Sequence, residues 1–210
     1  MSVVILLVII SGTLAVVGAE RRVRWLEVVF KPLTTILLLG VVGRPETTFA
    51  RLVTAGLVLS IVGDTALLWS SKQAFLVGLA AFLLAHLAYV VAFVTVSAGP
   101  SLPVALVALA VAVATRSTVR AIWVGSAEVR GPALAYAAVI SLMVVCAAAT
   151  MGGSLRMAPF AAVGAALFYL SDSSLARNLF AKPIPHVALL TLGVYWLGQL
   201  GIAIAAHGGT

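Results

Sequence analysis

Long apolar runs, separated by short polar segments, dominate the pattern of this chain. A helix needs about 20 consecutive apolar residues to cross a bilayer. Charged residues, glycines and prolines mark the ends of the runs. The run at 102–116 is short, and an extension through Trp123 is an alternative. The pattern predicts eight transmembrane helices, at residues 2–19, 28–43, 52–70, 74–97, 102–116, 132–151, 158–176 and 186–206.

The composition places the chain in a lipid environment. Hydrophobic residues make up 63% of its 210 residues and charged residues 9%, whereas a soluble domain is about half apolar and about a quarter charged. The mean hydropathy is +1.20. The first run lacks a basic leader and a cleavage site, so we expect a first membrane helix and not a removed signal peptide. The predicted fold class is all-α, a polytopic integral membrane bundle that forms one domain over residues 1–210.

Most of the basic residues lie in the loops between the apolar runs. The net charge is +7, but basic residues between hydrophobic segments determine topology and do not indicate nucleic-acid binding. The odd-numbered loops hold nine Lys and Arg residues and the even-numbered loops hold three. The positive-inside rule then predicts odd loops in the cytoplasm and both termini outside. We expect a bacterial inner (plasma) membrane.

Two aspartates interrupt the apolar runs, Asp64 in the third and Asp172 in the seventh. A carboxylate at membrane depth costs about 2.5–3.5 kcal/mol even on insertion scales, so it needs a partner, a water-filled cavity or a proton. From the rise of a helix, Asp64 lies roughly 9 Å, Asp172 roughly 6 Å and Lys31 roughly 5 Å from the cytoplasmic ends of their runs. These three side chains are therefore expected to converge at one level.

Other polar residues fall on the same helices. His86 and Tyr195 lie deeper than the aspartates, and Tyr89 and Gln199 lie about one turn beyond them. We predict a polar cavity capped by His86 and Gln199. Each of these residues also has a structural interpretation, such as a snorkelling lysine, a serine bonded to its own helix or an interfacial aromatic. The predicted supporting residues are Lys31, His86, Tyr89, Tyr169, Ser171, Ser173, Asn178, Tyr195 and Gln199.

A short internal similarity links the two aspartates. The segment Gly63-Asp64-Thr65-Ala66-Leu67 is similar to Ser171-Asp172-Ser173-Ser174-Leu175. Two parallel four-helix repeats would bring equivalent helices together about an axis along the membrane normal. Chance similarity of a short motif is the alternative.

Familiar catalytic motifs are missing from the sequence. It has no Gly-x-Ser-x-Gly elbow, no phosphate-binding loop and no His-Glu-x-x-His pair, and each of these would indicate a specific chemistry. Its three histidines and one cysteine are far apart, so no metal site and no cofactor are predicted. The remaining candidates for chemistry are carboxyl groups acting as acid and base.

Several short motifs together resemble one membrane enzyme family, the YhhN-like lysoplasmalogenases. The resemblance covers about residues 25–202. It implies an eight-helix, metal-independent hydrolase of the vinyl ether bond of lysoplasmalogens, with Asp64 and Asp172 as the catalytic pair. The implied partner is a lysophospholipid from the bilayer, and the products are a fatty aldehyde and glycerophospho-ethanolamine or glycerophospho-choline. The motifs are Lys31-Pro32, Gly63-Asp64, His86 with Tyr89, Gly164-Ala165 through Phe168, Ser171 to Ala176, and Tyr195 through Gln199.

The chemistry of a vinyl ether agrees with these residues. Vinyl ethers are stable to base and labile to acid, and burial beside a second carboxyl favours the protonated form of one of the two. The main alternative is a small proton-coupled transporter, because buried Asp and His residues also form proton relays. A lipid-binding scaffold is a third interpretation. The sequence makes no prediction about oligomeric state.

Overall fold

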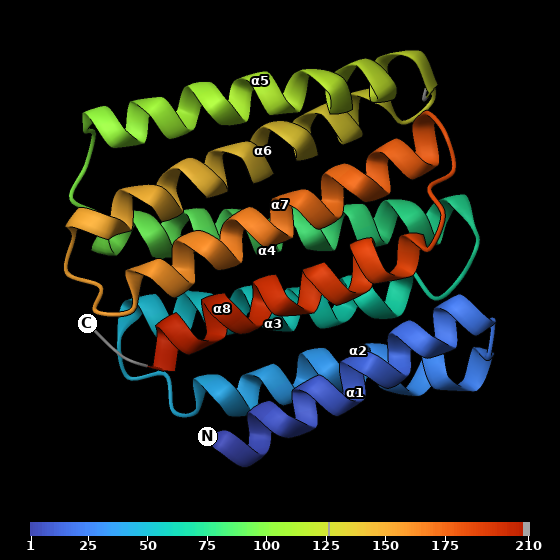
Figure 1. The fold of residues 1–210 in the computed structure, drawn as a ribbon, viewed down its shortest axis with the longest axis horizontal. Helices are drawn as coiled ribbons and strands as arrows, with labels where there is room; N and C mark the ends of the chain where they lie inside the picture. The colour runs from blue at the N-terminus through green and yellow to red at the C-terminus, as the bar shows by residue number, and fades with distance from the viewer. Residues whose placement is uncertain (126, 208–210) are drawn as a thin grey trace.

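A computed structural model describes residues 1–125 and 127–207 of the chain. In these ranges the chain forms eight α-helices, which lie side by side as a bundle (Figure 1). No strand occurs in these ranges. The start of α1 and the end of α8 lie at the same end of the bundle (Figure 1). The helices are α1 (Ser2–Arg21), α2 (Arg24–Val42), α3 (Thr48–Ala66), α4 (Lys72–Val96), α5 (Leu102–Gly125), α6 (Arg130–Ala149), α7 (Ala158–Phe180) and α8 (Val194–His207). A 3₁₀ turn, η1 (Thr150–Gly152), follows α6, and a π-helical turn, η2 (Leu189–Gly193), precedes α8.

Seven candidate spans among the described residues are long and apolar enough to cross a membrane, and the last of them joins η2 to α8. The exception is α7, because its second half carries Asp172, Arg177 and Asn178. The all-helical membrane bundle is thus confirmed.

Several predicted boundaries were wrong by a turn or more. Helix α5 continues to Gly125, which confirms the alternative extension through Trp123 and not an end at residue 116, because Arg116 and Arg120 are exposed on its surface and do not interrupt it. Helix α3 covers Thr48–Ala66 and not 52–70. Its first turn is capped by the Thr47 hydroxyl, which accepts a hydrogen bond from the Ala50 amide at 3.1 Å. Helix α7 extends to Phe180, one turn beyond residue 176.

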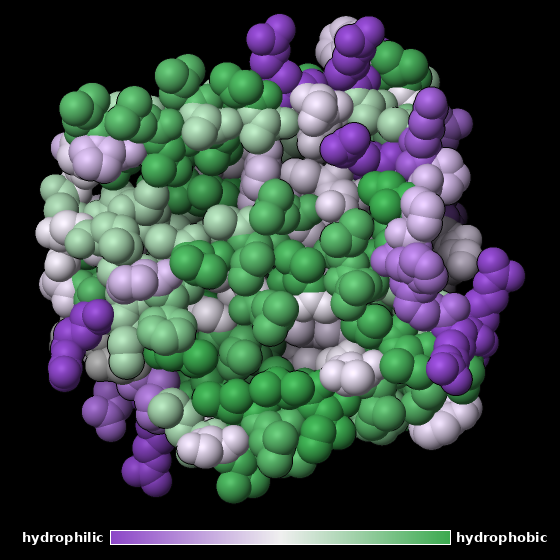
Figure 2. Space-filling view, in the orientation of Figure 1, coloured by the Kyte–Doolittle hydropathy of each residue, from purple (hydrophilic) through white to green (hydrophobic). Residues whose placement is uncertain are grey.

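The surface has the polarity of a protein embedded in lipid. Figure 2 shows hydrophobic side chains across the middle of one face and hydrophilic side chains gathered towards the helix ends. Large apolar residues such as Leu6, Leu84 and Leu109 are exposed on helices of the bundle. An exposed apolar surface of this extent is unfavourable in water, so the fold requires a bilayer around it.

Glycines set the contact between α7 and α8. A Cβ atom on Gly164 would lie 2.6 Å from the Gly198 carbonyl oxygen, and one on Gly198 would lie 2.7 Å from the Gly164 carbonyl oxygen. Any larger residue would push the two helices apart, as expected for small residues in membrane helix contacts. Helix α8 also packs against α2 and α3, so it joins α7, which carries Asp172, to the surroundings of Asp64, where Tyr195 bonds the carboxylate.

The π-helical turn η2 changes the path of the chain just before α8. The Ser171 hydroxyl donates to the Thr191 carbonyl inside this turn, at 2.6 Å. Single π turns leave main-chain groups to be satisfied by side chains and are frequent at functional sites. Here the turn ends at Gly193, two residues before Tyr195.

Candidate active site

The Asp64 carboxylate is buried at the meeting point of α2, α3 and α8. Its Oδ2 atom accepts hydrogen bonds from the Thr35 hydroxyl at 2.6 Å and from the Tyr195 hydroxyl at 2.9 Å. Lys31, one turn before Thr35, is also buried and interacts electrostatically with Asp64. Two hydroxyl donors and a lysine are the surroundings that stabilise an ionised carboxylate away from water.

The two hydroxyl groups that bond Asp64 themselves accept hydrogen bonds from other side chains. The Trp196 indole donates to the Thr35 hydroxyl at 3.2 Å, and the Gln199 amide nitrogen donates to the Tyr195 hydroxyl at 3.3 Å. Because each of these hydroxyls accepts one hydrogen bond, its own proton is free to point at Asp64. All donors in the network therefore point towards the carboxylate, and each hydrogen bond strengthens the next.

The Asp172 carboxyl has different neighbours, on α6 and α4. The Tyr136 hydroxyl donates a hydrogen bond to its Oδ2 atom, and the His86 Nε2 atom lies 3.8 Å from the same oxygen. The His86 Nδ1 atom lies 2.6 Å from the Phe82 carbonyl oxygen. A carbonyl oxygen only accepts, so Nδ1 carries the proton. The Nε2 atom is buried and has no hydrogen-bond partner.

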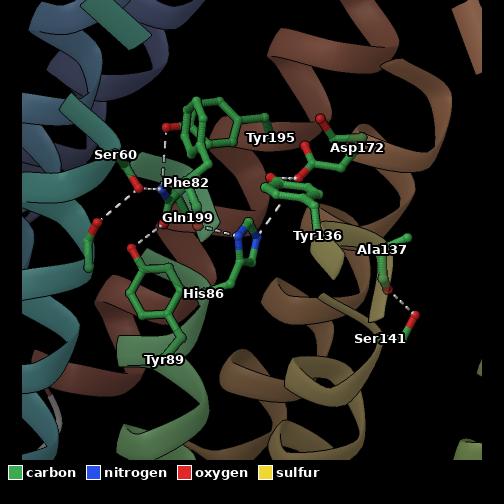
Figure 3. A network of polar contacts seen from close by, with 12 residues as sticks. Ser60, Phe82, His86, Tyr89, Tyr136, Ala137, Ser141, Asp172, Tyr195 and Gln199 are labelled. Atoms are coloured by element: carbon green, nitrogen blue, oxygen red, sulfur yellow. Dashed lines mark hydrogen bonds and ion pairs between the residues drawn. The ribbon is translucent and has the colours of Figure 1, made fainter. Parts of the chain in front are cut away.

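His86 lies between the two polar groups of the site (Figure 3). On one side are Tyr89 and Gln199, where the Tyr89 hydroxyl donates to the Gln199 amide oxygen at 2.7 Å. On the other side are Tyr136 and Asp172. The His86 ring also packs on Phe168, with ring centroids 4.5 Å apart. A fully buried polar and aromatic layer thus connects the surroundings of the two aspartates.

Both aspartates line one cavity of about 720 Å³ and interact electrostatically across it. The cavity also reaches the junction between α3 and α4, where Ser71 and Lys72, the first residue of α4, line it. Helices α5 and α6 contribute a wall without charged residues: Thr115, Thr118, Ile122, Ala133, Tyr136, Ala137 and Ile140. A pocket of this size with a mostly apolar lining and a few polar groups suits a small amphiphile.

The structure places the predicted residues in three groups. Lys31, Tyr169, Ser171, Ser173 and Tyr195 line the cavity together with the two aspartates. His86, Tyr89 and Gln199 lie in the buried layer behind it.

Asn178 is apart from both groups, because its side-chain oxygen accepts from the Ile184 amide at 2.9 Å and holds the segment after α7. Tyr169 hydrogen-bonds Thr115, with their oxygens 2.8 Å apart.

Sequence reasoning missed three polar partners in the site. Thr35 lies one helical turn after Lys31, so its position on the same face was a usable signal. Ser60, which accepts from the Gln199 amide at 2.9 Å, is one turn before Asp64 and carried the same signal. Tyr136 could not be assigned, because a lone tyrosine in an apolar helix does not indicate which helix it faces. In the described ranges, no group of three or more His, Cys, Asp and Glu side chains is arranged to hold a metal ion.

The fold and the cavity define a class, an integral membrane protein with two carboxyl groups facing one buried amphiphile-sized pocket. The family model described as the YhhN family matches residues 26–206, and the chain belongs to this family.

Among curated relatives, human lysoplasmalogenase TMEM86B is 34% identical over 189 residues, which cover 89% of this chain and 78% of the relative. Human lysoplasmalogenase TMEM86A is 31% identical over 157 residues, covering 72% and 63% of the two chains. A YhhN membrane protein of Escherichia coli O6:H1 is 32% identical over 172 residues, covering 79% of each. No solved structure matches the fold.

Proposed function

We propose that this protein is a lysoplasmalogenase-like hydrolase that cleaves the vinyl ether bond of alkenyl lysophospholipids. The observation that carries the proposal is the single cavity faced by both Asp64 and Asp172. Relatives that are named lysoplasmalogenases support the substrate class. The products are a fatty aldehyde and glycerophospho-ethanolamine or glycerophospho-choline.

The proposed reaction starts with one aspartate protonated and the other ionised. The carboxylic acid gives its proton to the β-carbon of the vinyl ether, and the π electrons form the new C–H bond. The oxocarbenium ion that results lies beside the second, ionised carboxylate, which stabilises its charge. General acid catalysis of this kind accelerates a reaction typically about 10²–10⁴-fold.

Water then adds to the α-carbon, and its proton passes to the ionised aspartate. In the hemiacetal, the first aspartate takes the hydroxyl proton while the second gives its proton to the departing glycerol oxygen. The C–O bond breaks, and aldehyde and alcohol leave. Both carboxyl groups return to their starting states, so the cycle needs no other reactant than water.

The supporting residues are proposed to hold the substrate and the acids. Lys31 is the buried cation that faces the cavity, and we propose that it pairs with Asp64 and attracts the lipid phosphate. Tyr195 orients Asp64 by its hydrogen bond. Tyr169, Ser171 and Ser173 shape the cavity wall, whereas His86, Tyr89 and Gln199 act from the buried layer behind it.

We also propose that the cavity opens towards the cytoplasm. It extends to Ser71 and Lys72 at the junction of α3 and α4. The loop that joins these two helices is the third, and the odd-numbered loops carry most of the basic residues. Loops rich in Lys and Arg stay on the cytoplasmic side of the membrane. Both termini then lie outside, and we propose that the membrane is the bacterial inner membrane. A C-terminal reporter that is active only in the cytoplasm would contradict this orientation.

We propose further that the bundle consists of two parallel four-helix halves. Helix α2 packs on α8 just as α6 packs on α4. Asp64 is contacted from α2 and α8, and Asp172 from α6 and α4. Each aspartate thus has one neighbour from its own half and one from the other half, which supports the repeat.

The experiment is a product assay in detergent. Purified protein is incubated with an alkenyl lysophospholipid, with its saturated alkyl ether and with its acyl ester, and products are followed by mass spectrometry. We expect aldehyde from the alkenyl lipid only. Asp64→Asn and Asp172→Asn are each expected to lose at least about a hundredfold in rate, the low end of what general acid–base catalysis contributes.

The matched control is Glu46→Gln, which makes the same carboxyl-to-amide change at an exposed position. It should keep full activity. Normal aldehyde release by either aspartate variant would overturn the proposal. Activity in detergent also separates the enzyme from a transporter, which requires a sealed vesicle; the names of the relatives do not favour the transporter.

A further inference from the structure

The inference rests on the proposed function: charge is distributed unevenly along the cavity, and this asymmetry orients an amphiphilic substrate. Its two lining cations, Lys31 and Lys72, belong to α2 and to the start of α4. Lys72 is exposed and pairs with Glu128 at 2.6 Å, so Lys31 is the cation within the cavity. Among the described residues, the α5–α6 wall has no charged lining residue, and it reaches Ile140, ten residues or about 15 Å into α6. An anionic phosphate is attracted towards Lys31, and an apolar tail is accommodated against α5 and α6.

This orientation places the two carbons of the vinyl ether differently. The ether oxygen and the α-carbon are attached to glycerol and lie on the Lys31 side, where Asp64 is held by α2 and α8. The β-carbon begins the tail and lies on the α6 side, where Tyr136 of α6 bonds Asp172. The proton must reach the β-carbon, and the positive charge develops at the α-carbon and the oxygen.

The hydrogen bonds at the two aspartates agree with that division. Every side chain that contacts Asp64 in its network donates, which suits a carboxylate. Asp172 also accepts a hydrogen bond, from Tyr136, but in addition it faces a bare acceptor, the His86 Nε2 atom at 3.8 Å. If both groups were charged, an N–H⁺···O⁻ bond of about 2.7–2.9 Å would be expected. The longer separation and the Nδ1 bond to Phe82 instead indicate a neutral imidazole, whose bare Nε2 atom is an acceptor available to a proton on Asp172.

We propose that Asp172 is the acid that protonates the β-carbon, and that Asp64 is the carboxylate that stabilises the oxocarbenium ion and accepts the proton of water. His86 and Tyr136 are positioning residues that act through Asp172. In the step itself, the Asp172 proton forms the C–H bond with the π electron pair. The α-carbon then takes the water oxygen, and the water proton goes to Asp64.

Binding of a cationic analogue tests this division without requiring turnover. The probe is a saturated lysolipid in which a secondary ammonium replaces the ether oxygen, so that its charge lies where the oxocarbenium ion carries part of its own. The matched probe is the neutral alkyl ether. We expect Asp64→Asn to lose about thirtyfold or more in affinity for the ammonium lipid, because a desolvated charge partner is removed. Asp172→Asn should change it by less than about threefold, because no charged partner is removed.

The neutral ether should bind both variants with nearly unchanged affinity, which shows that the cavity is intact. If Asp64→Asn fails this control, the double variant Asp64→Asn/Lys31→Met, which removes both buried charges, takes its place. Because it also removes the cation that attracts the phosphate, its affinity for the ammonium lipid is compared with its own affinity for the neutral ether, and that ratio is expected to fall. A selective loss in Asp172→Asn would overturn the division, and so would equal losses or no loss in both variants. These outcomes leave the proposed function standing, since that proposal fails only if aldehyde release is absent in the unmodified protein or survives in either variant.

Discussion

Asp64 and Asp172 are the same residue type in similar short motifs, yet their surroundings are opposite. Asp64 is buried, has a lysine as neighbour and receives two hydroxyl hydrogen bonds. Asp172 keeps 13% of its side chain exposed, accepts from the Tyr136 phenol and faces an unpaired imidazole nitrogen. Neighbours, and not residue identity, divide the acid from the carboxylate in such pairs. The pattern of donors and acceptors around each group is therefore the feature to perturb.

The largest effect is expected from removal of the Asp64 counter-charge. Lys31→Met should lower aldehyde release by about a hundredfold to a thousandfold, comparable to the loss of a preorganised electrostatic partner. It should also lower the melting temperature in detergent, because the change leaves a buried charge without compensation. Lys182→Met, the same change at an exposed position after α7, should leave both quantities unchanged. Equal effects of the two variants would show that Lys31 only anchors its helix.

A matched pair of tyrosine variants compares the two carboxyl groups directly. Tyr136→Phe removes the phenol that bonds Asp172 and should reduce kcat by about a hundredfold, within the range of acid–base catalysis. Tyr195→Phe leaves the Thr35 donor on Asp64 and should reduce kcat by only about tenfold, as for one hydrogen bond to a charged group. Steady-state kinetics on both variants measures the difference. A larger loss of kcat in Tyr195→Phe than in Tyr136→Phe would indicate that Asp64, and not Asp172, is the acid.

His86 is expected to act through Asp172 and not through substrate binding. His86→Phe should lower kcat by about thirtyfold with little change in KM, since an acid out of position costs transition-state stabilisation only. His86→Gln keeps an amide N–H that can donate to the Phe82 carbonyl and an amide oxygen that can face Asp172. This variant should recover most of the rate, to within about threefold of the unmodified protein, because the buried Phe82 carbonyl keeps a donor. A proportional rise of KM in both variants would indicate loss of the cavity wall.

The smallest effect concerns the tail side of the cavity. Ala137 lines the α6 wall and is buried, so Ala137→Leu should shift preference from long to short alkenyl tails by about tenfold, as methylene-sized changes do in apolar pockets. Ala138→Leu, the neighbouring and exposed position, is the control. Competition between two tail lengths in one assay gives the ratio. An unchanged ratio of the rates for the two tail lengths would show that the tail does not lie against the α6 wall.

The hydrophobic pattern alone determined the helical membrane fold and the candidate residues. Apolar runs specify membrane helices because the backbone must satisfy its own hydrogen bonds in lipid, and an aspartate in such a run is conspicuous because burial of its charge is costly. Helix ends were less certain, as α5 shows, because an exposed arginine does not stop a helix.

Only the tertiary structure decided which residues meet. The bond from Tyr136 to Asp172 spans 36 positions and that from Tyr195 to Asp64 spans 131, and the contact between α7 and α8 that positions Tyr195 depends on Gly164 and Gly198. A periodic sequence shows which face of a helix is polar, but not which helix that face meets. Packing makes that choice, because the closeness and rotation of the helices follow from side chains that are distant in the chain. Hence the pair of acids was visible in the sequence, whereas their unequal surroundings were not.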